Sequence, residues 1–175
     1  MIDGNLRLRL LKDSKKDYKM LEKWYQEEEI YSQFEQRKLD YDEIKDKYFP
    51  RTLKNTKIPV YMIEYEGKPV GIIQYQLIDD ENMKLYGIKY NKCYEIDIFI
   101  GELAMHNKGI GKKAINILTG FLFNNYQAKL LFMCPLKENI SAIKCYEKCG
   151  FKINKLFKTE DTIGNLQEYA LMIKE

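Results

Sequence analysis

Two adjacent segments, CYEIDIFIGE (Cys93–Glu102) and HNKGIGKKA (His106–Ala114), decide the expected fold. The first alternates apolar and polar side chains, which is typical of a β-strand, and it carries two carboxylates at Glu95 and Asp97. The second places a glycine pair and lysines before an amphipathic segment, which indicates a loop and the N-terminus of a helix. Because backbone N–H groups at a helix N-terminus bind anions, this arrangement predicts a phosphate-bearing ligand beside an acid/base site.

Length and composition indicate a single domain spanning residues 1–175. The 175 residues, 45% hydrophobic and 31% charged, are typical of one soluble globular unit. A net charge of +3 is too small for a nucleic-acid-binding profile. No secretory leader opens the chain, and its longest nearly apolar stretch, within Ala114–Phe123, is about half a membrane span. We therefore expect a cytoplasmic protein with no membrane or nucleic-acid partner.

The cysteines argue against a metal site. Cys93, Cys134, Cys145 and Cys149 form no C-x-x-C pair, and the chain has one histidine. Cys145 and Cys149 are separated by one helical turn. We expect reduced, half-buried thiols and no bound metal.

Periodicity predicts a single mixed, mostly antiparallel α/β sheet of about seven strands, flanked by helices. The segment Lys129–Cys134 is expected to run parallel to the strand at Cys93–Ile100, with a helix crossing between them. Ser14 is expected to cap the first helix, either Asp40 or Asp42 the second, and Asn139 the last. The expected strands are Asn5–Leu11, Ile58–Tyr65, Pro69–Ile78, Cys93–Ile100, Lys129–Cys134, Phe151–Thr159 and Leu166–Ile173; the expected helices are 14–25, 40–48, 109–125 and 139–148.

The glycine pair is open to several interpretations. Gly109–Ala114 formally satisfies G-x-G-x-x-A, but it does not directly follow a strand and no acidic residue ends the next strand, which disfavours a dinucleotide site. A nucleoside-triphosphate loop is disfavoured because Lys113 stands where serine or threonine is required. One remaining interpretation is a simple loop before a core helix. The other is a diphosphate site, which would offset the repulsion between the helix dipole and Lys108, Lys112 and Lys113.

Two motifs resemble those of the GNAT family of N-acetyltransferases. The first is Lys108-Gly109-Ile110-Gly111-Lys112, preceded by His106 where the family has Gln or Arg. The second is P-x-x-x-N-x-x-A-I-x-x-Y-E-K-x-G-F over residues 135–151. The resemblance implies the GNAT fold and acetyl-CoA as the cofactor, with its diphosphate on the first motif.

The resemblance narrows to the aminoglycoside 6'-N-acetyltransferase branch and covers nearly the whole chain. It rests on Leu21–Trp24 followed by an acidic run, on Tyr48-Phe49-Pro50, on Glu66–Gln74 and on Ile96-Asp97. The chain departs from the branch at Ile98, where glutamine is usual. The branch also includes enzymes that acetylate siderophore precursors.

The strand at Cys93–Ile100 is the expected acid/base element. Alternation places Glu95, Asp97 and Phe99 on one face, with the two carboxylates about 7 Å apart. Two close carboxylates on a partly buried strand tend to raise one pKa, which suits a base working near neutral pH. We expect Asp97 to bind the acceptor amine and accept its proton, directly or through water. The alternative is a carboxylate paired structurally with a lysine.

The family resemblance implies roles for further residues. Backbone N–H groups at Ile98, Phe99 and Ile100 would hold the thioester and the pantetheine arm, and Tyr146 would protonate the leaving thiolate. The remaining expected cofactor contacts are His106, Lys108, Gly109, Ile110, Gly111, Lys112, Lys113, Asn139 and Ala142.

The acceptor is expected to be a small cationic amine. The acidic runs Glu27–Glu29 and Asp79–Glu81 would attract a polycation despite the positive net charge. Expected contacts with the acceptor are Trp24, Gln74, Asp79, Asp80, Glu95 and Asp97.

Three functional hypotheses follow. The first is an acetyl-CoA-dependent aminoglycoside 6'-N-acetyltransferase that confers antibiotic resistance, acting as a monomer or homodimer. The second is the same chemistry on a siderophore hydroxylysine, a polyamine or a protein N-terminus. The third is a non-catalytic sensor that binds acyl-CoA.

Overall fold

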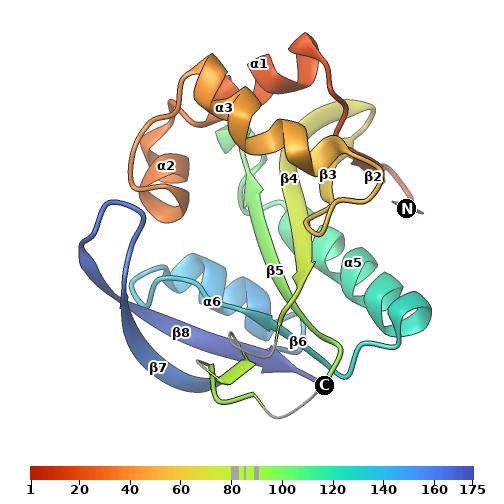
Figure 1. The fold of residues 1–175 in the computed structure, drawn as a ribbon. Coiled ribbons are helices and arrows are strands. Elements are labelled where there is room, and N and C mark those ends of the chain that lie inside the picture. Colours follow the sequence, from red (N-terminus) through yellow and green to blue (C-terminus); the bar gives the residue numbers. More distant parts are fainter. Residues whose placement is uncertain (80–82, 85, 89–90) are drawn as a thin grey trace.

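The computed structural model describes residues 1–79, 83–84, 86–88 and 91–175, whose strands form one mixed sheet (Figure 1). Eight strands lie in the order β1-β2-β3-β4-β5-β6-β8-β7, and every neighbouring pair is antiparallel except β5 and β6. The expected parallel pair is therefore confirmed, and the strand count exceeds the expected seven. The strands are β1 (Ile2–Asp3), β2 (Leu6–Leu10), β3 (Val60–Tyr65), β4 (Lys68–Leu77), β5 (Cys93–Ile100), β6 (Leu130–Met133), β7 (Lys152–Glu160) and β8 (Leu166–Lys174).

The helices begin where capping side chains were expected. Ser14 Oγ accepts a hydrogen bond from the Asp17 amide at 3.2 Å, and Asp40, rather than Asp42, forms a reciprocal capping box with Glu43. The acidic run at Glu27–Glu29 starts an additional helix, α2, that was not counted as a separate element. In the described part of the chain, no helix is long and apolar enough to cross a bilayer. The helices are α1 (Lys15–Trp24), α2 (Glu28–Phe34), α3 (Tyr41–Tyr48), α5 (Ile110–Tyr126) and α6 (Ile140–Glu147), with single 3₁₀ turns η1 (Phe49–Thr52) and η2 (Leu103–Met105).

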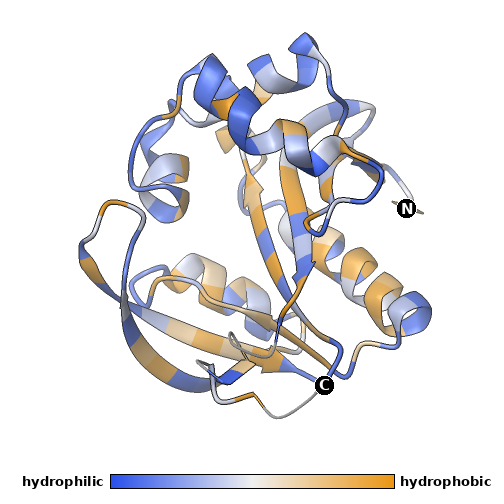
Figure 2. Ribbon diagram, viewed as in Figure 1, coloured by the Kyte–Doolittle hydropathy of each residue, from blue (hydrophilic) through white to orange (hydrophobic). Residues whose placement is uncertain are grey.

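The sheet is covered on both faces. On one face, α5 packs its apolar side against the sheet, and Ile96 and Ile98 of β5 belong to this core (Figure 2). On the other face, α1, α2 and α3 surround an aromatic core that contains Trp24, Tyr25 and Phe99. The expected alternation of β5 side chains is therefore confirmed, because neighbouring residues of this strand enter different cores.

The decisive feature of the sheet is that β5 and β6 separate. They pair only at Cys93↔Leu130, Tyr94↔Leu131 and Glu95↔Phe132, although β5 continues to Ile100. Along its other edge β5 stays paired with β4 as far as Gly71↔Ile100. The sheet is thus open between β5 and β6 from Ile96 onward.

The register shows which backbone groups face this opening. The Gly101 amide donates to the Val70 carbonyl at 2.8 Å, and the Ile78 amide donates to the Cys93 carbonyl at 3.0 Å. Hydrogen-bonded pairs alternate in an antiparallel ladder, so the odd-numbered residues of β5 bond to β4. The N–H and C=O groups of Ile98 and Ile100 therefore point away from β4 and into the opening.

Gly71 allows the close approach of β4 and β5 at this position. A Cβ at Gly71 would lie 2.2 Å from the Phe99 carbonyl oxygen and 2.8 Å from the Ile100 Cα.

We expect Gly71→Ala to lower the free energy of unfolding by about 2 kcal/mol or more, as overpacking does. Gly120 of α5 is the matched control, because a Cβ there meets nothing within 4 Å. Gly120→Ala should raise stability by about 0.5–1 kcal/mol. Urea denaturation measures the free energy of unfolding of both variants. If the two substitutions change it equally, the close packing at Gly71 is contradicted.

Candidate active site

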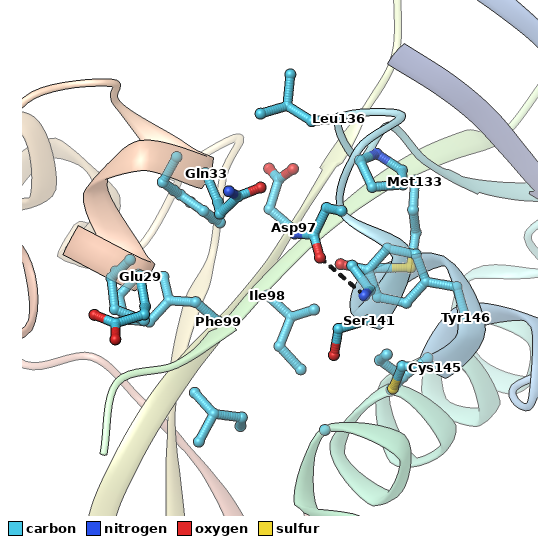
Figure 3. A pocket seen from close by; sticks show the side chains of 18 of the residues that line it. Glu29, Gln33, Asp97, Ile98, Phe99, Met133, Leu136, Ser141, Cys145 and Tyr146 are labelled. Carbon is cyan, nitrogen blue, oxygen red and sulfur yellow. Dashed lines mark hydrogen bonds between the residues drawn. The ribbon is translucent and has the colours of Figure 1, made fainter. Parts of the chain in front are cut away.

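A cavity of about 1260 Å³ occupies the opening between β5 and β6 and reaches both faces of the sheet. On one side its wall comes from α2, Lys47 of α3 and Arg51 of η1; on the other it comes from the first turn of α5 and from α6. Figure 3 shows Asp97 and Ile98 between the α2 side chains Glu29 and Gln33 and the α6 side chains Ser141, Cys145 and Tyr146. Two ligands that approach from opposite faces of the sheet can therefore meet at β5.

The first turn of α5 forms one end of the cavity wall. Its N-cap Gly109 has φ +76°, a left-handed conformation that glycine adopts without strain, and it has no side chain to occupy the first N–H groups. Gly111 and Lys112 line the wall. These amides and the helix dipole suit a diphosphate, so the residues present fit the nucleotide end of coenzyme A.

Most of the predicted cofactor contacts lie in the cavity wall. Two lie outside it: Lys108 is exposed with Nζ 3.8 Å from the Met105 sulfur, and Lys113 is exposed on α5. Asn139 caps α6 as expected, because its Oδ1 accepts from the Ala142 amide at 3.0 Å. The predicted residues in the wall are Ile98, Phe99, Ile100, His106, Gly109, Ile110, Gly111, Lys112, Asn139, Ala142 and Tyr146.

His106 links the loop before α5 to the end of β5. Its Nε2 lies 2.6 Å from the Ile100 carbonyl oxygen. This contact occupies one of the backbone groups that face the opening and leaves the N–H groups of Ile98 and Ile100 directed into it. The imidazole therefore orients the loop, while backbone groups remain available for a ligand.

Asp97 lies at the centre of the cavity in a chain of oriented polar groups. Arg51 Nη1 donates to Gln74 Oε1 at 2.7 Å, and Gln74 Nε2 donates to Asp97 Oδ2 at 2.9 Å. Burial raises the pKa of Asp97, while the Gln74 hydrogen bond and the charges of Arg51 and Lys47 partly offset this shift. In the described part of the chain, no lysine or arginine nitrogen lies within 4.0 Å of this carboxylate. The charge of Lys47 still favours its ionised form, so structural pairing with a lysine stays an alternative to the role of base.

Glu95 lies beside this centre but does not line the cavity wall. Its Oε2 accepts from Gln76 Nε2 at 2.6 Å. Burial and the negative charge of Asp97 raise the pKa of Glu95 to about 7. The two carboxylates therefore affect each other's protonation, as the spacing on one strand face predicts.

Lys47 was not predicted from the sequence. It lines the wall, forms a salt bridge with Glu35, and lies over the rings of Tyr25 and Tyr48. Burial, and secondarily the charge of Arg51, lowers the pKa of Lys47 to about 8. Lys47 and Arg51 flank Tyr48-Phe49-Pro50, but the sequence gives no signal that α3 and η1 bring their charges near Asp97.

The predicted acceptor contacts are only partly brought together. Gln74 and Asp97 line the cavity, as do Glu28 and Glu29 of the acidic run. Trp24 does not: it is fully buried, packs edge-on against Phe99, and donates to Glu102 Oε1 at 2.9 Å. Asp79 is exposed outside the wall, and Asp80 lies outside the described residues.

Tyr146 reaches the cavity from α6. It is 8% exposed and its ring packs against Phe151. Burial, with the nearby Cys145 and Asp97, raises the pKa of Tyr146. The phenol therefore keeps its proton at neutral pH.

The tip of the β7–β8 hairpin contacts the segment after α2, which lines the cavity. Thr162 Oγ1, at the hairpin tip, lies 2.9 Å from Gln36 Oε1 and also contacts the Glu35 carbonyl. Figure 1 shows the tip reaching across to α2. Since Glu35 also pairs with Lys47, this contact connects the hairpin, α2 and α3.

The chain is similar in sequence and fold to acetyltransferases. The model of the acetyltransferase (GNAT) family matches residues 18–151. An aminoglycoside N(6')-acetyltransferase type 1 of Klebsiella pneumoniae is 24% identical over 162 residues, which cover 91% of this chain and 80% of that protein.

Two solved structures share the fold. Aminoglycoside acetyltransferase AAC(6')-Ib in complex with coenzyme A and kanamycin has a TM-score of 0.76 at 22% identity, covering 97% of this chain and 94% of that one. Spermidine N-acetyltransferase from Vibrio cholerae, in complex with CoA and spermine, has a TM-score of 0.79 at 22% identity, covering 98% and 96%.

The family match and the site agree on the class of protein. The chain belongs to the acetyltransferase (GNAT) family and is an acetyl-CoA-dependent N-acetyltransferase. The first turn of α5, the free edge of β5 and the α6 wall fit this cofactor.

The raised pKa of Asp97 makes a prediction about stability. The folded protein holds this proton to higher pH than the unfolded chain does, so the ionised carboxylate costs stability above the folded pKa. We expect Asp97→Asn to raise the melting temperature at pH 8 and to have a smaller effect at pH 4, because lowering the pH favours the protonated carboxyl that the folded protein holds more tightly. Calorimetry at both pH values measures this difference.

Asp17 provides the matched control for this prediction. It is 5% exposed, but Arg9 binds it through Nη1 at 2.7 Å and Nη2 at 3.1 Å. Asp17→Asn should therefore destabilise the protein at pH 8, by about 3 kcal/mol for a broken buried pair. A loss of stability in Asp97→Asn at pH 8 would show that the native environment favours the ionised carboxylate.

Proposed function

We propose that this protein acetylates a primary amine of a polycationic small molecule, with the 6'-amine of an aminoglycoside antibiotic as the first candidate. The observation that carries the proposal is the cavity through the sheet, which has an anion site on one face and carboxylates on the other, with Asp97 between them.

The acceptor half of the cavity favours a polycation. Glu28 and Glu29 line its wall, and within the described part of the chain neither forms a salt bridge. Glu35 is paired with Lys47, so it contributes little net charge. Two carboxylates at the mouth and one at the centre would bind ammonium groups separated along one molecule.

Asp97 is the proposed base. An acceptor amine arrives as an ammonium and must lose a proton before it can attack a carbonyl carbon. Asp97 accepts that proton, directly or through a water molecule. Gln74 fixes the orientation of the carboxylate, and Arg51 fixes the orientation of Gln74.

The free edge of β5 and Tyr146 complete the proposed chemistry. When bound, acetyl-CoA supplies the acetyl group as a thioester. The N–H groups of Ile98 and Ile100 would hold the arm of the cofactor and donate to the carbonyl oxygen as negative charge develops there. The Tyr146 hydroxyl would give its proton to the departing sulfur.

A polyamine is the second candidate acceptor. The Vibrio cholerae structure of similar fold was solved with spermine, and a flexible linear polyamine would satisfy the same separated carboxylates. A sensor without catalytic activity is disfavoured, because an ionisable group held with a raised pKa in a cavity costs stability and is typical of catalytic sites.

Release of the coenzyme A thiol, measured with acetyl-CoA and a panel of kanamycin, ribostamycin and spermine, distinguishes these candidates. We expect turnover with at least one aminoglycoside. Asp97→Asn should lower turnover by about 10²–10⁴-fold, the usual contribution of a general base, and leave coenzyme A affinity nearly unchanged. Turnover of spermine alone would replace the first candidate by the second. Coenzyme A binding without turnover of any amine would favour the sensor.

A further inference from the structure

Two thiols lie side by side at the cofactor end of the cavity. Cys145 is in the last turn of α6 and lines the wall, and Cys149 follows one turn later, just beyond the helix end, where it is 4% exposed. The Cys149 thiol donates to the Lys112 carbonyl oxygen at 3.8 Å, and it lies one helical turn from Cys145 in the sequence. The pair therefore joins α6 to the first turn of α5.

The surroundings of Cys145 are electropositive. A Cβ at Gly111 would lie 3.7 Å from Cys145 Sγ, so the sulfur lies against the N-terminal turn of α5. Lys112 and Lys148 line the same wall. The neighbouring Cys149 thiol, together with the charges of Lys148 and Lys112, lowers the pKa of Cys145 to about 7. The positive charge that suits a diphosphate therefore also favours a thiolate.

The other thiols of the chain differ from Cys145. Cys134 also lines the cavity, but burial and the carboxylates Glu95 and Asp97 raise its pKa. Burial raises the pKa of Cys93, and the neighbouring Cys145 together with burial raises that of Cys149. Of the four thiols, Cys145 alone combines access to the cavity with an environment that favours the reactive form.

We propose that Cys145 is a site of covalent thiol modification, which reacts with small-molecule disulfides and is shielded when the cofactor end of the cavity is occupied. In the reaction, Cys145 Sγ attacks one sulfur of the disulfide. The sulfur–sulfur bond of the reagent breaks, a mixed disulfide forms on Cys145, and the other half leaves as a thiolate. The shielding rests on the cofactor placement proposed above, whereas the reactivity of the thiol does not.

The mixed disulfide has a steric consequence. Because the sulfur lies against Gly111, any group attached to it fills the space beside the first turn of α5. The diphosphate end of a cofactor would need that same space. The modified protein should therefore lose its affinity for coenzyme A.

The test is the reaction of the folded protein with 5,5'-dithiobis(2-nitrobenzoate) at pH 7, with the labelled residue located by peptide mass mapping. We expect one fast equivalent per chain, absent in Cys145→Ser and retained in Cys134→Ser. Cys149→Ala removes the neighbouring thiol that lowers the pKa of Cys145 and should slow the reaction by about tenfold, while Cys149→Ser keeps a polar O–H there and should stay near the wild-type rate. A fast equivalent that maps to Cys134, or that persists in Cys145→Ser, would overturn the assignment.

The same reaction with saturating desulfo-coenzyme A, which has no thiol of its own, tests the shielding. We expect labelling of Cys145 to slow by at least about tenfold, because occupancy blocks access. Undiminished labelling would overturn the claim that an occupied cavity shields Cys145. A calorimetric titration then shows whether desulfo-coenzyme A bound to the protein. Absence of binding would count against the proposed cofactor placement, while the fast reaction of Cys145 would still stand.

Discussion

The separation of β5 from β6 is the constraint on which the rest of the site depends. The two strands share three residue pairs and then part, while β4 holds β5 straight to its end. A parallel pair that continued would close the sheet and bury its backbone groups in a ladder. Because it stops at Glu95, the edge of β5 is open from both faces, and a donor and an acceptor can meet there.

The chain maintains this opening at a cost in stability. Asp97 is ionisable and lies deep in the cavity, and burial alone would disfavour its charge. The opposing forces come from the Gln74 amide and from the charges of Arg51 and Lys47. These residues come from β4, η1 and α3, so the protonation of one carboxylate depends on the packing of three elements. Such groups persist where function requires them.

Much of the architecture was predictable from local sequence. The alternating segment Cys93–Ile100 forms the strand β5 with the expected bounds. Ser14 and Asn139 cap the N-termini of α1 and α6, as expected. These signals are local: side-chain alternation, a capping oxygen and a glycine pair. The two-residue strand β1 was missed because so short a segment has no periodicity.

The interactions that were missed depend on packing between distant elements. Arg51 and Lys47 are brought near Asp97 because α3 and η1 pack over β4. The hydrophobic periodicity of the sequence does not predict that contact. Trp24 was expected in the acceptor cleft, but it is buried above Gly101, where a Cβ would lie 2.2 Å from its ring. Cys145 is a free, half-buried thiol as expected, but the sequence does not show that the first turn of α5 lies against it.

The measurement that tests the central claim most directly is amide hydrogen exchange at Ile98 and Ile100 with and without coenzyme A. Both N–H groups face the opening, and in the free protein they should exchange faster than the β4-paired amides of Asp97 and Phe99. Binding should slow exchange at Ile98 and Ile100 selectively, because the cofactor would occupy the edge that β6 leaves free. If coenzyme A binds and these two amides exchange as before, the cofactor does not lie between β5 and β6.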